Sequence, residues 1–235
     1  MTATAKARKR AELRRARGLP NTVPIERVRD HIQYLVDLGL THTMISQGAE
    51  VGRSTVGWIL YRNNHFVCID PAAKILQVTH LPVPSQPTVL TVGARRRTRA
   101  LNALGWPTNE LGHRLGQSSR STLNKTLAST YTTYAMWSRV RDLYDELSGT
   151  PGPSPDSAKR AKAAGHPPPL AWEGIDIDHP LTEPDWVAVW GQCKHGHLYS
   201  PENTATRADG SRACRTCQRE GNTRARANKR AHTTA

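Results

Sequence analysis

Residues 35–50, LVDLGLTHTMISQGAE, decide the fold, because their pattern returns in residues 101–116, LNALGWPTNELGHRLG. Apolar and glycine positions recur at an offset of 66 residues: Leu35 and Leu101, Gly39 and Gly105, Ile45 and Leu111. The next segments, RSTV at residues 53–56 and RSTL at residues 120–123, recur at an offset of 67, so one extra residue falls in the turn before them, where insertions are tolerated. An offset kept over so many positions indicates a duplicated module.

Hydrophobic spacing predicts that each module is built from short helices. In the first module, residues 24–80, an apolar stripe with helical spacing marks the first helix: Val28, Ile32, Leu35 and Val36. Gly39 is expected to end this helix, and Thr41 is the predicted N-cap of the second. A third helix over residues 54–61 and a fourth helix follow. The second module, residues 94–148, is expected to repeat this order.

Composition divides the remainder of the chain. Residues 1–20 carry seven Lys and Arg against one Glu and form a basic arm, expected to be helical on DNA and disordered without it, with a mere solubility tail as the alternative. Residues 81–93 are a Pro-rich connector, expected to be extended and stiff. Residues 149–190 combine a linker with an acidic, Trp-containing segment, which either docks on a basic module and covers it or acts as a packed spacer.

Each repeat carries the spacing typical of a helix-turn-helix. That motif needs a small residue where two helices cross, a tight turn, and apolar residues at fixed offsets. Ser46 is the small crossing residue of the first module, and Gly116 is the turn glycine of the second, whereas Glu50 stands at the turn-glycine position of the first. The predicted fold is therefore mostly α, with two tandem helix-turn-helix modules. A small helical bundle that binds protein is the alternative.

The composition is strongly basic. Lys and Arg number 33 against 19 Asp and Glu, a formal net charge of +14, which favours a polyanionic partner: nucleic acid first and an anionic membrane second. No run of 18 apolar residues is present, and no apolar segment follows the basic N-terminus, so neither a membrane span nor a secretory signal is expected. We therefore expect double-stranded DNA as the partner, no membrane, and a cytoplasmic location.

The outward positions of the two third helices are the predicted base-reading surface. They are Arg53, Ser54, Thr55 and Arg62 in the first module, and Ser119, Arg120, Ser121, Asn124 and Lys125 in the second. Arg pairs with guanine, Asn with adenine, and Ser or Thr with bases or phosphates. Phosphate contacts are predicted for two further groups: Arg95, Arg96 and Arg97, which open the second module, and Arg215, Arg219 and Arg226 on a basic C-terminal helix.

Residues 191–230 contain two pairs of metal-ligand residue types. They are Cys193 and His197, followed after sixteen residues by Cys214 and Cys217. This spacing suits a structural, tetrahedral Zn²⁺, with His195 as the alternative to the second ligand. The hairpin signal at Asp209-Gly210 and the helix that follows complete a small treble-clef-like finger, which would need the metal to fold. The remaining cysteine, Cys68, is expected in the core, and the cysteine usage indicates a reducing compartment.

Several segments resemble helix-turn-helix DNA-binding proteins of actinobacterial phages and prophages. They are GARRRTRALNALGW at residues 93–106, LAWEGIDIDHP at residues 170–180, and the finger segments CKHGHLYSPEN at residues 193–203 and GSRACRTC at residues 210–217. The finger is also similar to the zinc-binding ends of phage HNH-type endonucleases. The resemblance covers residues 25–225 and implies DNA binding in a bacterial cytoplasm, without implying a particular operator.

The favoured function is a non-enzymatic, sequence-specific DNA-binding regulator of transcription, and two alternatives stay open. An HNH-type endonuclease would use the Asp178-His179 pair, Asn203 and a final metal-holding residue, for which only Asn222 and the distant His232 are available. An architectural or RNA-binding zinc protein is the third hypothesis. Since two modules in one chain can imitate a dimer, a monomer and a homodimer are both compatible with the sequence.

Overall fold

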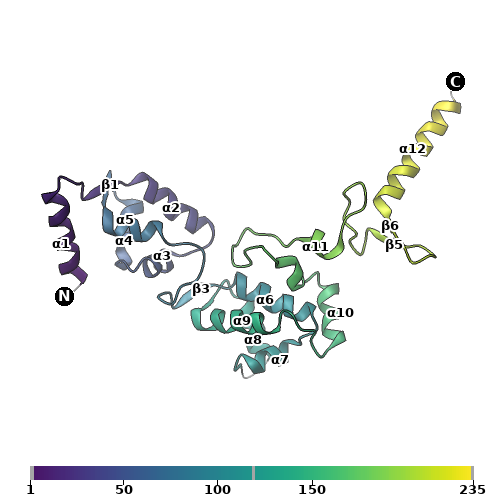
Figure 1. Ribbon diagram of the computed structural model, residues 1–235, viewed down its shortest axis with the longest axis horizontal. Helices are drawn as coiled ribbons and strands as arrows, with labels where there is room; N and C mark the ends of the chain where they lie inside the picture. The colour runs from purple at the N-terminus through teal and green to yellow at the C-terminus, as the bar shows by residue number, and fades with distance from the viewer. Residues whose placement is uncertain (1–2, 118–119, 234–235) are drawn as a thin grey trace.

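The computed structural model describes residues 3–117 and 120–233 of the chain. It is mostly helical, as the sequence predicts, and it also contains small strand pairs. Figure 1 shows an elongated arrangement in which α1 (Ala3–Ala16) lies at one end and α12 (Arg215–Thr233) at the other. Two helical units and a long C-terminal segment connect these ends.

The two units have the same order of elements: strand, three helices, strand, helix. Unit 1, residues 22–76, consists of β1 (Thr22–Pro24), α2 (Glu26–Asp37), α3 (His42–Gly48), α4 (Arg53–Tyr61), β2 (Phe66–Cys68) and α5 (Ile69–Leu76). Unit 2, residues 88–147, consists of β3 (Thr88–Leu90), α6 (Val92–Ala103), α7 (Thr108–Arg114), α8 (Arg120–Ala128), β4 (Tyr131–Thr133) and α9 (Tyr134–Leu147). The repeat in the sequence therefore corresponds to a repeat of secondary structure.

A two-stranded antiparallel ribbon joins the ends of each unit, although helical spacing predicts no strands. In β1 and β2, Val23 lies opposite Val67, and in β3 and β4, Val89 lies opposite Thr132. A three-residue strand is too short to show an alternating pattern in the sequence, so only the pairing reveals it. Because β3 lies within residues 81–93, the end of the expected Pro-rich connector is part of unit 2.

Local signals place several helix ends as the sequence predicts. The Thr41 hydroxyl caps α3 by accepting a hydrogen bond from the backbone N–H three residues later at 3.2 Å. Thr133 caps α9 in the same way at 3.1 Å. Gly39 and Gly105, which follow α2 and α6, have the same left-handed φ of 99°. Corresponding residues of the two units thus have corresponding conformations.

Each unit buries its own apolar core. The largest fully buried side chains of unit 1 are Ile25, Val28, Ile32, Leu35, Ile45, Val56, Ile59 and Ile75. In unit 2 the core includes Leu101, Leu111, Leu123, Trp137 and Val140. Burying one such side chain contributes about 1.5–3 kcal/mol. Three members of the predicted stripe of α2 are buried and the fourth, Val36, is partly buried, which confirms that the stripe faces the core.

The two units also contact each other. Leu90 of β3 and Tyr131 of β4 pack against the core of unit 1, and the Tyr131 hydroxyl donates a hydrogen bond to the carbonyl oxygen of Gly39 at 3.2 Å. Between the units, the buried Gln86 donates to the carbonyl oxygen of Met44 at 3.0 Å. The segment between the units is therefore packed onto unit 1 and is not a free spacer.

The chain after unit 2 returns along it before reaching the C-terminus. Its elements are α10 (Pro155–Ala163), the short 3₁₀ helix η1 (Pro169–Trp172), α11 (Trp186–Trp190), β5 (Thr204–Thr206), β6 (Arg212–Cys214) and α12. Ser154 caps α10, which buries Ala161 and packs against α6. Trp172 is buried next to Ala100 of α6. Residues 149–172 therefore pack against unit 2, so the segment predicted to be a linker is not a free connector.

Cys68 lies at the exposed end of β2. The strand alternates exposed, buried and exposed positions, and Val67 takes the inward one. The expectation that Cys68 is a core residue is therefore wrong, because the period-two geometry of a strand turns it away from the core.

Candidate metal centre and nucleic-acid interface

Four predicted ligands come together near the C-terminus. The ligand atoms of Cys193, His197, Cys214 and Cys217 all lie within 4.8 Å of one another, and none of these thiols forms a disulfide. The Cys193 and Cys217 sulfurs are 3.6 Å apart, and the Nδ1 atom of His197 lies 3.3 Å from the Cys217 sulfur and 3.7 Å from each of the other two. The structure thus forms a Cys₃His cluster able to bind a metal ion.

Three local elements position the ligands. Residues 193–197 form a tight knuckle in which the Cys193 N–H donates to the His197 carbonyl oxygen at 2.9 Å. The β5–β6 hairpin turns at the predicted Asp209-Gly210 signal, where Gly210 has a φ of 81°, and ends at Cys214. The first turn of α12 supplies Cys217. Each ligand therefore lies on a short element whose geometry depends little on distant packing.

Polar side chains around the cluster orient its ligands. The Asn203 amide donates to the Cys214 sulfur at 3.4 Å and to the Leu198 carbonyl oxygen at 2.7 Å, while its oxygen accepts from the Thr216 N–H at 2.9 Å. A carboxylate oxygen of Glu220 lies 3.6 Å from Nε2 of His197. Such second contacts hold ligands in the orientation that a metal requires. Spacing between the cysteines gave no signal for either residue.

The cluster shifts the protonation of its thiols. A hydrogen bond from the backbone of Cys217 lowers the pKa of Cys214 to about 6, with help from the side chains of Cys217 and Asn203. Burial, together with the neighbouring thiols Cys193 and Cys214, raises the pKa of Cys217 to about 12. Thiols this close resist simultaneous ionisation, and a bound cation would offset that repulsion.

The distances also fit a tetrahedral ion. With bond lengths of about 2.3 Å to sulfur and 2.1 Å to nitrogen, ligand atoms of a tetrahedral Zn²⁺ lie roughly 3.6–3.8 Å apart. The observed separations of 3.3–3.7 Å are close to that range. His197 is the ligand that the structure brings to the cluster, whereas the alternative, His195, is exposed and lies outside it.

The chain between α3 and α4 has the same hydrogen bonds as the chain between α7 and α8. The Val51 N–H donates to the Ser46 carbonyl oxygen at 2.9 Å, and the Gln117 N–H donates to that of Gly112 at 2.8 Å, again at an offset of 66 residues. Glu50, with a φ of 49°, adopts the left-handed conformation that Gly116 adopts at 68°. The missing glycine therefore does not change the turn.

The predicted base-reading residues of α4 are accessible. Arg53, Ser54 and Arg62 are exposed, and Thr55 is half-buried. In α8, Asn124 and Lys125 are exposed. Ser119 and the side chains of Arg120 and Ser121 lie outside the described residues.

Sequence reasoning missed one feature of α4. Tyr61 is 77% exposed at the end of the helix, one turn from the half-exposed Trp58, and its ring is tilted against that of His42, with centroids 5.9 Å apart. Two exposed aromatic side chains on one short helix are unusual for a surface without a partner.

Arg95, Arg96 and Arg97 are not placed for phosphate contacts, and that prediction is wrong. Arg95 donates to the carbonyl oxygens of Leu127 and Ser129 at the end of α8, at 2.7 and 3.0 Å. The guanidinium of Arg96 donates to four carbonyl oxygens of residues 177–182. Arg97 is buried. These arginines satisfy groups within the protein: Arg95 binds the end of α8, and Arg96 and Arg97 bind the returning chain.

The residue pair of the endonuclease hypothesis is also used inside the protein. Asp178 is buried and accepts two hydrogen bonds from Arg97, each at 2.7 Å. His179 contacts Tyr34 of α2 at 3.3 Å. Asn203 binds the cluster's own backbone, as described above. Among the described residues, the contacts of Asp178 and His179 are therefore with units 1 and 2, and those of Asn203 are within the finger.

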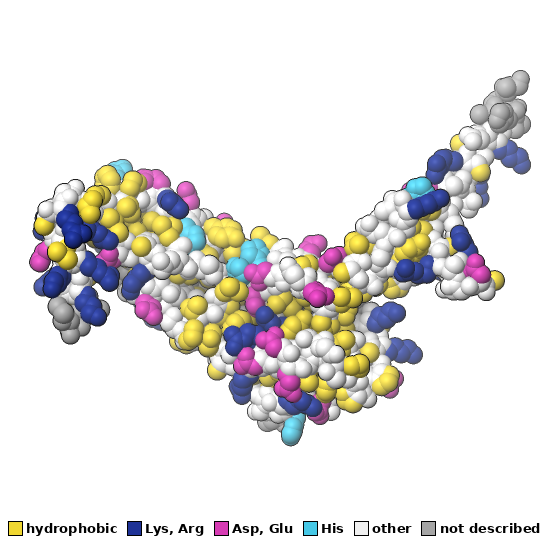
Figure 2. Space-filling model, viewed as in Figure 1, with side chains coloured by type: hydrophobic (Ala, Val, Ile, Leu, Met, Phe, Trp, Pro, Cys, Tyr) yellow, Lys and Arg dark blue, Asp and Glu magenta, His cyan; other side chains and the backbone are white. Residues whose placement is uncertain are grey.

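The terminal helices carry many of the exposed positive charges. Arg215, Arg219 and Arg226 of α12 are exposed, and most basic side chains of α1 are exposed as well. Figure 2 shows Lys and Arg side chains gathered at both ends of the molecule. None of the described helices combines the length and the apolar character needed to cross a membrane.

Two kinds of surface thus stand out: a Cys₃His cluster that carries a basic helix, and two helices with exposed polar faces on repeated units. Neither kind contains an assembled catalytic group among the described residues. Comparison of the chain with models of known families, with curated proteins and with solved structures gives no match.

Proposed function

We propose that the chain is a sequence-specific double-stranded DNA-binding protein that regulates transcription, with α3–α4 and α7–α8 acting as two helix-turn-helix pairs. The observation that carries this proposal is the pair of matching turns, with the same hydrogen bonds, each followed by a helix with an exposed polar face. A helix presented in this way fits the major groove, where side chains contact base edges. Arg53, Arg62 and Asn124 are the residues best suited to such contacts.

The C-terminal cluster supports a structural role for Zn²⁺ in this function. Three thiols and one imidazole form a donor set that zinc prefers, and the knuckle, hairpin and helix around them match a treble-clef-like finger. Zinc would hold the start of α12, so that Arg215, Arg219 and Arg226 project along one helix. These cations, together with α1, would contact phosphates and add affinity without sequence preference.

Selection from a randomised duplex library tests the proposal. The wild-type protein should enrich a defined sequence, and Asn124→Ala should weaken binding to it by about 1–3 kcal/mol while relaxing the preference at one base pair. The matched control is Asn109→Ala, an exposed asparagine on α7, which should keep the base preference. Equal loss on every sequence for Asn124→Ala would contradict base reading by α8, and failure to enrich any sequence would contradict the proposed function.

A further inference from the structure

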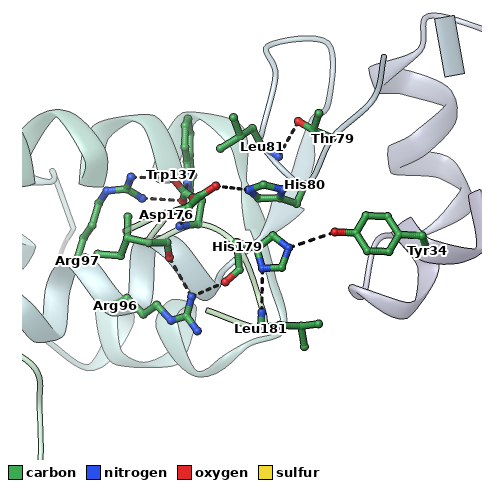
Figure 3. A network of polar contacts seen from close by, with 12 residues as sticks. Tyr34, Thr79, His80, Leu81, Arg96, Arg97, Trp137, Asp176, His179 and Leu181 are labelled. Carbon is green, nitrogen blue, oxygen red and sulfur yellow. Dashed lines mark hydrogen bonds and ion pairs between the residues drawn. The ribbon is translucent and has the colours of Figure 1, made fainter. Parts of the chain in front are cut away.

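Residues 175–182, here called the strap, are anchored firmly to unit 2. The Asp178 carboxylate accepts two hydrogen bonds from the Arg97 guanidinium at 2.7 Å each and a third from the indole Nε1 of Trp137 at 2.8 Å (Figure 3). Both charged side chains are less than a tenth exposed. A buried, bidentate ion pair with a further donor is strongly directional, so it holds the strap at one place on α6 and α9.

The backbone of the strap is bound as well. Arg96 donates hydrogen bonds of 2.6–3.1 Å to the carbonyl oxygens of Ile177, His179, Pro180 and Thr182, and it stacks on Trp172 at 4.9 Å. Gly93 leaves the room needed for this approach, because a Cβ there would come within 1.7 Å of an Asp178 carboxylate oxygen. Together these contacts fix the course of the strap across the start of α6.

From this anchor the strap reaches unit 1. Asp176 pairs with Nε2 of His80, just after α5, at 2.7 Å, and Nε2 of His179 lies 3.3 Å from the Tyr34 hydroxyl on α2. The His80 and His179 rings meet edge to face, with centroids 4.6 Å apart. Although burial opposes it, hydrogen bonding from His80 helps to lower the pKa of Asp176 below its ordinary value. Figure 3 shows these side chains converging from both units.

The strap adds a second attachment between the units, far from the first in the sequence. The first is the contact of Leu90 and Tyr131 with unit 1. With this single contact, unit 2 could rotate relative to unit 1. In Figure 1 the strap runs above α6, whereas α3–α4 and α7–α8 lie on the lower sides of their units. It can therefore join the units without covering α4 or α8.

We propose that the strap is a brace that sets the spacing and relative orientation of α4 and α8, and so restricts the protein to DNA whose two half-sites have one separation. This inference rests on the proposed function. Tyr34, His80, Asp176 and His179 are its positioning residues, because they latch the strap to unit 1. The latch is more exposed than the anchor, with Tyr34 49%, Asp176 45% and His80 15% exposed, and neither Tyr34 nor His80 contacts the buried pair of Arg97 and Asp178.

The test variant is Tyr34→Phe/His80→Ala, which removes the hydrogen bond to His179, the pair with Asp176 and the ring contact, and leaves the strap itself intact. His65→Ala, an exposed histidine of unit 1 outside these contacts, is the matched control. The distance distribution between probes at Glu26 and Asp145, both exposed, reports on the units without DNA. Probes are attached through non-canonical amino acids, so that the cysteines stay free. Unchanged unfolding transitions check that both units stay folded.

The DNA readout uses duplexes from the library selection with one base pair inserted between the two half-sites, which rotates one half-site by about 34° relative to the other. Wild type and His65→Ala should lose about tenfold or more in affinity, whereas the latch variant should lose less than about threefold and show a broader distance distribution. An unchanged insertion penalty in the latch variant overturns the spacing role, whatever the distance distribution shows. If wild type enriches sites without a fixed spacing, the inference fails while the proposed function stands; if it enriches no sequence, both fail.

Discussion

Glu50 and Gly116 occupy the same position in the two units and share a backbone conformation, although their side chains differ. The φ of 49° at Glu50 lies in the left-handed region, where Gly116 lies in the second unit at 68°. A residue with a Cβ is strained there by roughly 1–2 kcal/mol, whereas glycine is not. The turn is kept in unit 1 because Val51 and Ser46 close it with a hydrogen bond and the core beneath it is packed.

Exchanging the residues at this turn should change stability in opposite directions. Glu50→Gly is expected to raise the free energy of unfolding by about 0.5–1 kcal/mol, since relief of strain exceeds the added freedom of the unfolded chain. Gly116→Ala should lower it by about 1 kcal/mol, because only conformation is affected: a Cβ there meets nothing closer than Arg139 at 3.5 Å. Urea denaturation, with unchanged m-values, would measure both changes in the free energy of unfolding. Two changes of the same sign would contradict the left-handed conformation at these two positions.

The buried pair of Arg97 and Asp178 is the residue-scale feature with the largest expected energy. Asp178→Asn leaves the Arg97 charge buried without its partner and should cost about 3–5 kcal/mol of unfolding free energy. Asp142→Asn breaks an exposed pair with Arg141 and should cost at most about 1 kcal/mol. Thermal or urea unfolding of the two variants provides the comparison. If Asp178→Asn lowers the free energy of unfolding as little as Asp142→Asn does, the buried ion pair with Arg97 does not contribute the expected stability.

At the scale of the element, the finger is the part that depends on a ligand. Its strands are three residues long, and Ala213 and Cys214 are its buried side chains among the described residues, so apolar burial is too small to hold it together. Units 1 and 2, by contrast, have cores of their own. We therefore expect the finger to unfold separately from the units.

Removal of the metal should show this separation. One Zn²⁺ per chain is expected by elemental analysis, and a strong chelator or Cys217→Ser should cause rapid amide exchange in residues 193–229 while exchange in both unit cores stays slow. Cys68→Ser, at an exposed cysteine, is the control and should keep the zinc content. Loss of zinc in the control, or protection of the finger after chelation, would contradict a structural zinc site at the four ligands.

Sequence patterns predict some elements better than others. The helices with an apolar stripe or a capping threonine, such as α2 and α3, are confirmed, because spacing of 3.6 residues and caps are local properties. The ribbons β1–β2 and β3–β4 were missed, since they consist of pairing between segments more than 40 residues apart. The four cluster ligands were predictable because their chemistry and spacing are both short-range.

On the scale of the whole molecule, the positive charge is divided between an internal and an external part. Arg95, Arg96 and Arg97 form hydrogen bonds within the protein. The helices α12 and α1 present exposed cations at the two ends of the molecule. The net charge of +14 therefore overstates the number of residues free to contact a polyanion on unit 2. The cations that we propose for phosphate contacts therefore lie at the ends of the molecule.

Salt dependence should identify these contacts. DNA affinity of the wild type should fall steeply with salt, and Arg219→Gln/Arg226→Gln should reduce the magnitude of the log–log slope by about 2, since each phosphate contact contributes about 0.9, without changing the preferred sequence. Arg141→Gln, which replaces an arginine already paired with Asp142, should leave the slope unchanged. A wild-type slope near zero would contradict binding to phosphates altogether.

The sequence by itself determined the repeat, the helical stripes, the capping residues and the four cluster ligands, because each depends on spacing along a short stretch of chain. The tertiary structure alone decided which arginines are free, that Cys68 is exposed, and that Asp176, Asp178 and His179 join the two units. These properties depend on where the returning chain lies against α6 and α2. That position is set by contacts between residues that are separated by 81 to 145 positions in the sequence.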